Sequence, residues 1–216
     1  MADNEPPGRE LPNFRSKRLL FRPFAPSDAE DAFAIFGDTE VMHYSVSGRD
    51  RDLEATAARV ERYARLNAAS GFAPWAVVEA ASEYVVGSCG LMRLKDGKDV
   101  EIAYRLRRDR WGRGFAIEAA TAWLDRGFSL LRLPRILAFV DPTNTASLRV
   151  VDKLGMRYVE DCHYEGIPVR KFQIGRLYHP PLAADSRSAV GRKSEAHSAI
   201  GTERQQQGPP VSTPDS

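Results

Sequence analysis

The stretch "RDRWGRGFAIEA", residues 108–119, places Gly112 and Gly114 on either side of an arginine. It follows an alternating apolar run and precedes a pattern of helical period. Glycines at a strand-to-helix junction let backbone amides approach a ligand closely, and the first amides of a helix have no partner within the helix. The stretch therefore predicts a site for an anion, such as a phosphate or pyrophosphate, formed by the amides of about residues 110–115.

Two common phosphate-binding motifs do not fit this stretch. A dinucleotide fold requires a third glycine and parallel strands on both sides, and neither is expected here. A P-loop is excluded because no Gly-Lys-Ser/Thr follows. The local excess of arginine is compatible with anion binding and also with a solvated charged face; the arginines are Arg105, Arg107, Arg108, Arg110 and Arg113.

The surrounding sequence predicts alternating blocks of strands and helices. Three consecutive strand patterns with short connections indicate an antiparallel meander before the glycine stretch, and the strand, helix, strand order after it indicates a parallel crossover. The expected class is therefore α+β, with a mixed, mostly antiparallel sheet and about four helices. The strands are expected at 18–24, 72–80, 83–94, 99–106, 135–140, 157–166 and 169–177, and the helices at 28–36, 51–69, 114–128 and 145–154.

Length and composition indicate one globular domain. The chain has 216 residues, 43% of them hydrophobic and 28% charged, and its net charge of +2 gives no reason to expect nucleic acid or a membrane surface as partner. We assign residues 1–13 to a flexible leader, 14–179 to the domain and 180–216 to a disordered tail that is rich in Pro, Gly, Ser and Gln.

The location and the cysteine chemistry are also constrained by the sequence. The N-terminus lacks a secretory signal pattern and no long apolar run is present, so a cytoplasmic protein is expected. Cys89 and Cys162 match neither a disulfide framework nor a metal-ligand spacing, and we interpret them as reduced thiols. No metal site is expected.

Three linked motifs in this chain resemble those of a known family. "EIAYRL" at 101–106, "WGRGFAIEA" at 111–119 and "NTASLRVVDKLGM" at 144–156 stand in the order and spacing found in the GNAT superfamily of acetyl-CoA-dependent N-acetyltransferases. The resemblance is greatest to the branch of ribosomal-protein alanine N-acetyltransferases. It implies the acyl-CoA N-acyltransferase fold, acetyl-CoA as cosubstrate and a primary amine as acceptor.

The resemblance also implies a set of cofactor-binding positions. The amides of the glycine stretch would hold the pyrophosphate of coenzyme A, and the pantetheine arm would lie along the strand that ends at Leu106. Asn144 would hydrogen-bond the pantetheine, although a simple helix cap is the alternative. Asp109 stands where the superfamily usually has Gln or Arg. The positions expected at the pyrophosphate are Arg110, Trp111, Gly112, Arg113, Gly114, Phe115 and Ala116.

Acetyl transfer to an amine requires a base, because only the neutral amine attacks the thioester. Glu101 is the first candidate, since the resemblance places a proposed general base there; a solvated or ion-paired strand residue is the alternative. Glu165 is the second candidate, as base or as binder of the acceptor ammonium group, with a turn residue as the alternative. A histidine can also act as a base near pH 7, so His163 is considered, although a lone histidine on a strand is more often structural.

Two further residues of the motifs have open roles. Ser147 is expected to reach the leaving thiolate or its surroundings, or else to belong only to the helix start. Glu118 lies one turn into the helix after the glycines, and we favour a structural role for it.

The sequence thus predicts direct transfer of an acetyl group from acetyl-CoA to a protein N-terminus or small-molecule amine, without a covalent enzyme intermediate. Two other hypotheses remain open at this point. One is a non-catalytic module that senses acyl-CoA and acts through a partner, and the other is a nucleotide-binding protein unrelated to acyl transfer. A monomer and a homodimer are both compatible with the sequence. The loops at 42–51 and 162–168 are expected to line the acceptor site.

Overall fold

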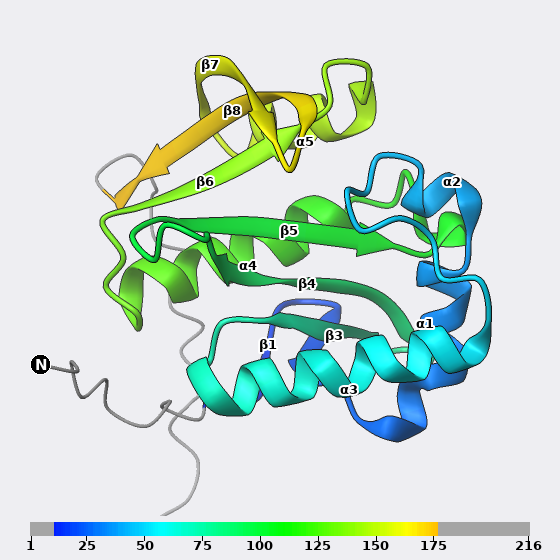
Figure 1. The fold of residues 1–216 in the computed structure, drawn as a ribbon. Coiled ribbons are helices and arrows are strands. Elements are labelled where there is room, and N and C mark those ends of the chain that lie inside the picture. Colours follow the sequence, from blue (N-terminus) through cyan, green and yellow to red (C-terminus); the bar gives the residue numbers. More distant parts are fainter. Residues whose placement is uncertain (1–10, 177–216) are drawn as a thin grey trace, which may run out of the picture. The chain divides into compact units, whose positions relative to one another are not determined.

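Eight strands form one sheet in the computed structural model, which describes residues 11–176. The order across the sheet is β1-β2-β3-β4-β5-β6-β8-β7, and every neighbouring pair is antiparallel except β5 with β6 (Figure 1). The predicted mixed, mostly antiparallel sheet is confirmed. The strands are β1 (Phe14–Arg15), β2 (Leu19–Arg22), β3 (Pro74–Glu79), β4 (Val85–Arg93), β5 (Val100–Leu106), β6 (Arg135–Val140), β7 (Arg157–Tyr164) and β8 (Ile167–Gly175).

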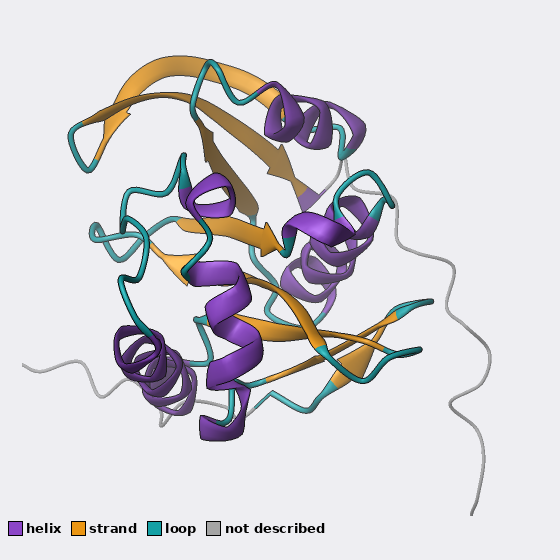
Figure 2. Ribbon diagram, turned by 90° about the vertical axis from the view of Figure 1, so that its right-hand side faces the viewer, coloured by secondary structure: helices purple, strands orange, loops and turns teal. Residues whose placement is uncertain are grey.

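Helices cover both faces of this sheet (Figure 2). The helices α1, α2 and α3 pack around one hydrophobic cluster, which includes Phe36, Val60 and Val85, and α4 packs around a second cluster on the other face. The α-helices of the described residues are α1 (Ala29–Phe36), α2 (Thr39–Met42), α3 (Leu53–Ser70), α4 (Phe115–Ser129) and α5 (Thr145–Lys153), with 3-10 turns η1 (Pro26–Asp28) and η2 (Arg108–Arg110).

Local sequence signals explain the helix ends. The side chain of Asp52 accepts a hydrogen bond from the Ala55 amide at 2.8 Å and caps α3, and Gly71, with a φ of 71°, ends that helix. Asn144 caps α5 in the same way, through the Ser147 amide at 3.0 Å. These caps place the start of α5 where the sequence predicts it.

The larger cluster is built around two tryptophans. Trp75 and Trp123 are fully buried, and their rings meet edge to face with centroids 5.3 Å apart. Phe14, on the two-residue strand β1, stacks on Phe21 at 4.5 Å. That strand is too short to give a periodic pattern, so the sequence does not predict it.

The chain ends differ partly from expectation. Leu11, within the predicted leader, is 4% exposed and belongs to the core, and the Pro12 carbonyl accepts a hydrogen bond from Arg126 Nη2 at 2.7 Å. Residues 11–13 therefore pack against the domain, whereas 1–10 and the predicted tail 180–216 lie outside the described residues. Both cysteines are free thiols, Cys89 buried and Cys162 half-buried. Within residues 11–176 none of the helices combines the length and apolar character needed to span a bilayer.

The two central strands of the sheet diverge. The parallel contact of β5 with β6 is a single residue pair, Glu101 with Leu137, whereas β4 pairs with β5 along its whole length. Figure 1 shows β6 running away from β5 beyond that contact. The edge of β5 that faces β6 therefore has unpaired backbone groups, which an extended ligand can bind.

Candidate active site

The glycine stretch forms a turn whose amides are free. Gly112 and Gly114 have φ values of 74° and 79°, which favour glycine, and Gly114 immediately precedes α4. Among residues 11–176 the amides of Gly112, Arg113 and Gly114 have no acceptor, and the first amide bonded at this end of α4 is that of Glu118, to the Gly114 carbonyl at 3.1 Å. Free amides at the N-terminus of a helix are the arrangement that an anion site requires.

The amides of Arg110 and Trp111, which the sequence predicts to be part of this site, already donate hydrogen bonds within the protein. The Arg110 amide donates to the Arg107 carbonyl at 3.0 Å and the Trp111 amide to the Arg108 carbonyl at 3.1 Å, inside η2. The indole Nε1 of Trp111 donates to the Leu106 carbonyl at 2.9 Å, so this carbonyl at the end of β5 also has a partner. The free amides therefore begin at Gly112 rather than at Arg110.

Ion pairs explain why an aspartate is tolerated at position 109. Arg110 lies 2.6 Å from Asp109 and 3.1 Å from Glu79, and Arg107 lies 3.3 Å from Asp109. The guanidinium of Arg110 is thus neutralised by carboxylates and is not a free partner for a phosphate. Arg108 and Arg113 are exposed and have no carboxylate partner within the described part of the chain, so their side chains supply the positive charge around the glycines.

Arg18 and Glu118 fasten the glycine turn to the N-terminal strands. The Glu118 carboxylate accepts hydrogen bonds from Ser16 Oγ, the Arg18 amide and Arg18 Nε, each at 2.7 Å. Arg18 Nη1 also donates to the Arg113 carbonyl at 3.0 Å, and its guanidinium lies 4.3 Å from the centre of the Phe115 ring. Burial alone would raise the pKa of Glu118, but these hydrogen bonds outweigh it and lower the pKa. The geometry supports the structural role expected for Glu118.

Glu101 is a buried carboxylate at the point where the strands diverge. It is 5% exposed, and the hydroxyl of Tyr164 donates to its Oε1 at 2.8 Å. The Tyr164 ring is held in turn by stacking on Phe139, with centroids 4.5 Å apart. Burial raises the pKa of Glu101, and the Tyr164 hydrogen bond and the charge of Arg105 offset this only in part. A carboxylate with a raised pKa is a suitable acceptor for a proton near neutral pH.

Glu165 occupies the turn of the β7–β8 hairpin. Its φ is 50° and that of Gly166 is 81°, as in a tight two-residue hairpin turn. The side chain is 41% exposed and lies 2.9 Å from Lys95 Nζ. Its charge still raises the pKa of Glu101, so it lies near the first candidate base. His163 is exposed on β7 and pairs in register with Pro168.

A second polar group lies on β5 beside the start of α5. The hydroxyl of Tyr104 is buried and makes no hydrogen bond of good geometry with a described residue, although Ser147 lies near enough to lower its pKa. Burial is the larger effect and raises the pKa of Tyr104 to about 12. The Oδ1 atom of Asn144 is used as the cap of α5. Burial also raises the pKa of Cys89, which makes this thiol a poor nucleophile.

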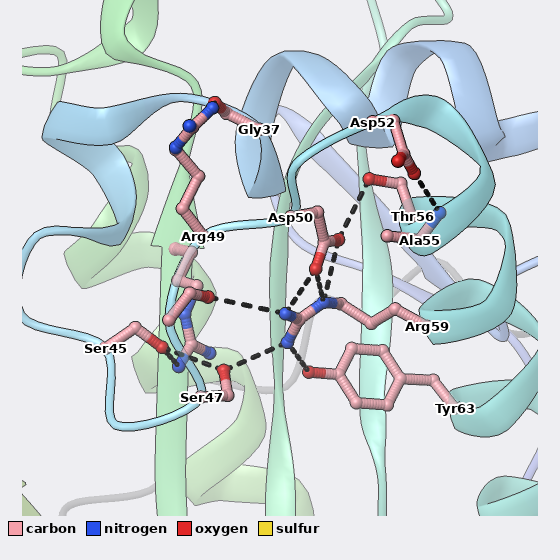
Figure 3. A network of polar contacts seen from close by, with 12 residues as sticks. Gly37, Ser45, Ser47, Arg49, Asp50, Asp52, Ala55, Thr56, Arg59 and Tyr63 are labelled. Carbon is pink, nitrogen blue, oxygen red and sulfur yellow. Dashed lines mark hydrogen bonds and ion pairs between the residues drawn. The ribbon is translucent and has the colours of Figure 1, made fainter.

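The loop between α2 and α3 is fixed by a buried polar network, drawn in Figure 3. Arg59, 5% exposed, contacts Asp50, 7% exposed, through Nη2 at 2.6 Å and through Nε. Asp50 accepts a further hydrogen bond from the Thr56 hydroxyl at 2.9 Å, and Arg59 Nη1 donates to Ser47 Oγ at 3.0 Å. This network ties the loop, predicted to line the acceptor site, to α3.

The sequence assigned no specific site role to four residues of this region. Tyr104 and Arg105 both belong to the quoted "EIAYRL" motif, and Arg105 stands out only as part of the local arginine excess, so their positions are visible in the sequence although their contacts are not. Tyr164 immediately precedes Glu165, and Arg18 lies in the first predicted strand. The hydrogen-bond partners of Arg18, Arg105 and Tyr164 stand 60 to 100 residues away along the chain, and the fold brings each of these three pairs together. No group of three or more potential metal ligands occurs among the residues that the structure describes.

Comparisons with known proteins identify the family of this chain. The family model described as acetyltransferase (GNAT) domain matches residues 18–157. The uncharacterised N-acetyltransferase p20 of Bacillus licheniformis is 29% identical over 143 residues, which cover 66% of this chain and 80% of that protein.

Solved structures show the same fold. A GNAT-family acetyltransferase from Bacillus anthracis has a TM-score of 0.65 and 27% identity, and the match covers 76% of this chain and 99% of that one. RimJ of Mycobacterium smegmatis, solved in complex with CoA-disulfide, has a TM-score of 0.62 and 22% identity, covering 73% of this chain and 81% of that one. Because the family model spans more than half of its residues, the chain belongs to the GNAT acetyltransferase family.

Proposed function

We propose that this protein transfers an acetyl group from acetyl-CoA directly to a primary amine, with Glu101 as the general base. The observation that carries the proposal is the layout of β5. The strand leads from buried Glu101, at its start, to the free amides of Gly112–Gly114 just beyond its end. A base and an anion site are thus joined by a strand edge that diverges from its neighbour.

The groups along β5 and at the start of α4 are suited to the parts of coenzyme A. The amides of residues 112–116 would hold the pyrophosphate, and the edge of β5 that diverges from β6, before the Leu106 carbonyl that Trp111 occupies, would receive the pantetheine arm. Asn144, whose Oδ1 caps α5, would offer its side-chain nitrogen to the same arm. The unpaired hydroxyl of Tyr104 and the side chain of Ser147 would face the sulfur. RimJ, solved with a coenzyme A derivative, offers a parallel for this assignment.

The chemistry assigned to this chain is proton transfer and orientation. Bound acetyl-CoA would supply the thioester. Glu101 would take the proton that the amine loses as its nitrogen bonds to the acetyl carbon, directly or through one water. Tyr104 or Ser147 would donate its proton to the sulfur as the carbon–sulfur bond breaks, so that coenzyme A leaves as a thiol, and the proton taken up by Glu101 would return through solvent to restore that hydroxyl. Glu165, exposed and paired with Lys95, would act on the acceptor ammonium group rather than on the reacting atoms.

Calorimetry and a coupled assay test the proposal. The protein should bind acetyl-CoA and coenzyme A, and it should release free thiol when acetyl-CoA is mixed with a panel of primary amines. Binding of ATP or NAD in place of coenzyme A would contradict it. Binding of acetyl-CoA without thiol release from any amine would favour the non-catalytic sensor.

Loss of the Tyr164 hydroxyl should move the pH profile. The hydrogen bond to Glu101 favours the ionised carboxylate, so in Tyr164→Phe the pKa of Glu101 rises further. Because the base must be ionised, the acidic limb of kcat/KM should shift to higher pH. The measurement is kcat/KM against pH, with the exposed Tyr158→Phe as matched control. An unchanged limb in Tyr164→Phe would show that Glu101 does not set it.

Loss of the Arg18 contacts should weaken cofactor binding. In Arg18→Met the glycine turn loses its hydrogen bond at the Arg113 carbonyl and the charge beside Glu118. We expect the Kd for coenzyme A to rise about fivefold, as for the loss of roughly 1 kcal/mol, with kcat nearly unchanged. Lys17→Met, at an exposed neighbouring position, is the control. Equal Kd values in the two variants would contradict a role for Arg18 in positioning the turn.

A further inference from the structure

Arg105 lies on the same strand face as Glu101. Residues 101, 103 and 105 alternate to one side of β5, and Arg105 Nη2 donates to Ser45 Oγ at 2.9 Å in the loop between α2 and α3. Ser45 in turn contacts Ser47 at 3.0 Å, and Ser47 accepts from Arg59. The buried network of Figure 3 therefore holds the loop against which the Arg105 side chain rests.

Arg105 makes no ion pair at contact distance within residues 11–176, although its charge still lowers the pKa of Glu101. The side chain is half-buried, yet no carboxylate of residues 11–176 lies within 4.0 Å of its guanidinium. Other half-buried or buried arginines near this region are paired: Arg59 with Asp50, Arg107 with Asp109 and Arg110 with Glu79. A guanidinium has five donors, and the contact with Ser45 uses one nitrogen. A partly desolvated cation with unused donors favours an anionic ligand.

We propose that Arg105 binds a carboxylate of the acceptor, so that the substrates are primary amines that also carry a carboxylate. This inference rests on the proposed function, because it takes Glu101 as the place of the amine. Glu101 and Arg105 are complementary to such a substrate, because the negative side chain of Glu101 would face the amine and the positive side chain of Arg105 would face the carboxylate. In an extended strand the Cα atoms of residues 101 and 105 are about 13 Å apart. The carboxylate should therefore stand several bonds from the amine.

The same charge selects against other amines. A polyamine or an aminoglycoside would place a second positive group near Arg105, which is unfavourable where the site is partly shielded from water. An amine with a neutral tail would leave the donors of Arg105 without a new acceptor. The expected order of preference is carboxylate-bearing, then neutral, then polycationic amines.

Matched acceptors test the inference. The first pair is ε-aminocaproate and its amide, and the second is the dipeptide amide Ala-Glu and its neutral analogue Ala-Gln. In each pair the reacting amine is the same and only the distant carboxylate changes. With the wild-type protein we expect kcat/KM to be at least about tenfold higher for the acid than for the amide in one or both pairs.

Four variants distinguish binding of the acceptor carboxylate by Arg105 from a role of Arg105 in supporting the loop between α2 and α3. Arg105→Met should bring the ratio of acid to amide close to one, and Arg105→Lys should retain part of it. Ser45→Ala removes the contact with the loop but keeps the cation, so the ratio should persist even if overall activity falls. Arg65→Met, on the exposed face of α3, should behave as wild type. Circular dichroism and the Kd for acetyl-CoA verify that each variant is folded and loaded.

Several results would overturn the inference and leave the proposed function standing. They are equal rates for acid and amide, faster acetylation of polyamines, or an acid preference that survives in Arg105→Met. A rise in the Kd for acetyl-CoA in Arg105→Met, with no change in the ratio, would assign Arg105 to the cofactor instead. Absence of acetyl-CoA binding by the wild-type protein would refute the proposed function itself, and the inference with it.

Discussion

Glu101→Gln is expected to lower kcat/KM by about a hundredfold to ten-thousandfold, the range for loss of a general base. The amide has the size of the carboxylate and can still accept from Tyr164, so packing around the site is preserved. A buried charge is replaced by a neutral group, so the free energy of unfolding should not fall appreciably. The Kd for acetyl-CoA should remain within about twofold, because the free amides lie beyond the other end of β5.

Steady-state kinetics and calorimetry on the same samples measure this effect, with Glu165→Gln as the matched control. Glu165 is 41% exposed and paired with Lys95, so its substitution should reduce kcat/KM only a few-fold, mainly through KM for the acceptor. The reverse outcome, a large loss of kcat in Glu165→Gln and a small one in Glu101→Gln, would make Glu165 the base.

The largest effect on stability is expected at Arg59. In Arg59→Met the Asp50 carboxylate stays buried without its cation, and removal of one partner of a buried pair costs about 3–5 kcal/mol. The free energy of unfolding, measured by urea denaturation, should fall by this amount. The double variant Asp50→Asn/Arg59→Met should recover part of the loss, because it no longer contains the isolated charge.

Arg65→Met provides the control for this prediction. Its ion pair with Glu61 is exposed on both sides and lies on the same helix, so its loss should cost less than about 0.5 kcal/mol. A cost for Arg59→Met no larger than this would contradict a stabilising role of the network. Since Arg59 also donates to Ser47, Arg59→Met should in addition raise KM for the acceptor more than KM for acetyl-CoA.

The elements of this fold were predictable where a strong local signal exists. The meander β3–β5, the glycine turn, α4 and the capped helix α5 follow from alternation, from two glycines and from Asn144. These features depend on residues within a few positions of one another. Each of the three family motifs is likewise a short run, and together they lie within residues 101–156.

The contacts that define the site were not predictable in this way. The sequence shows five arginines around the glycines, but only the fold pairs Arg110 with Glu79 and leaves Arg105 without a carboxylate. In the same way, the sequence singles out Glu101 by its motif but does not show that it is buried or that Tyr164, 63 residues further on, donates a hydrogen bond to it. Such pairs depend on the arrangement of the whole sheet.

The sequence by itself therefore determined the order of the longer elements, although not the short β1 and α2, together with the glycine turn before α4 and the identity of the polar residues along β5. The tertiary structure decided which of these residues are buried, which are neutralised and which retain free donors. The physical reason is that backbone conformation and capping depend on neighbouring residues, whereas burial and charge pairing depend on groups that meet only when distant strands and loops pack. Glu101 is the first candidate base by its motif alone, but its burial and its bond with Tyr164, like the unused donors of Arg105, come only from that packing.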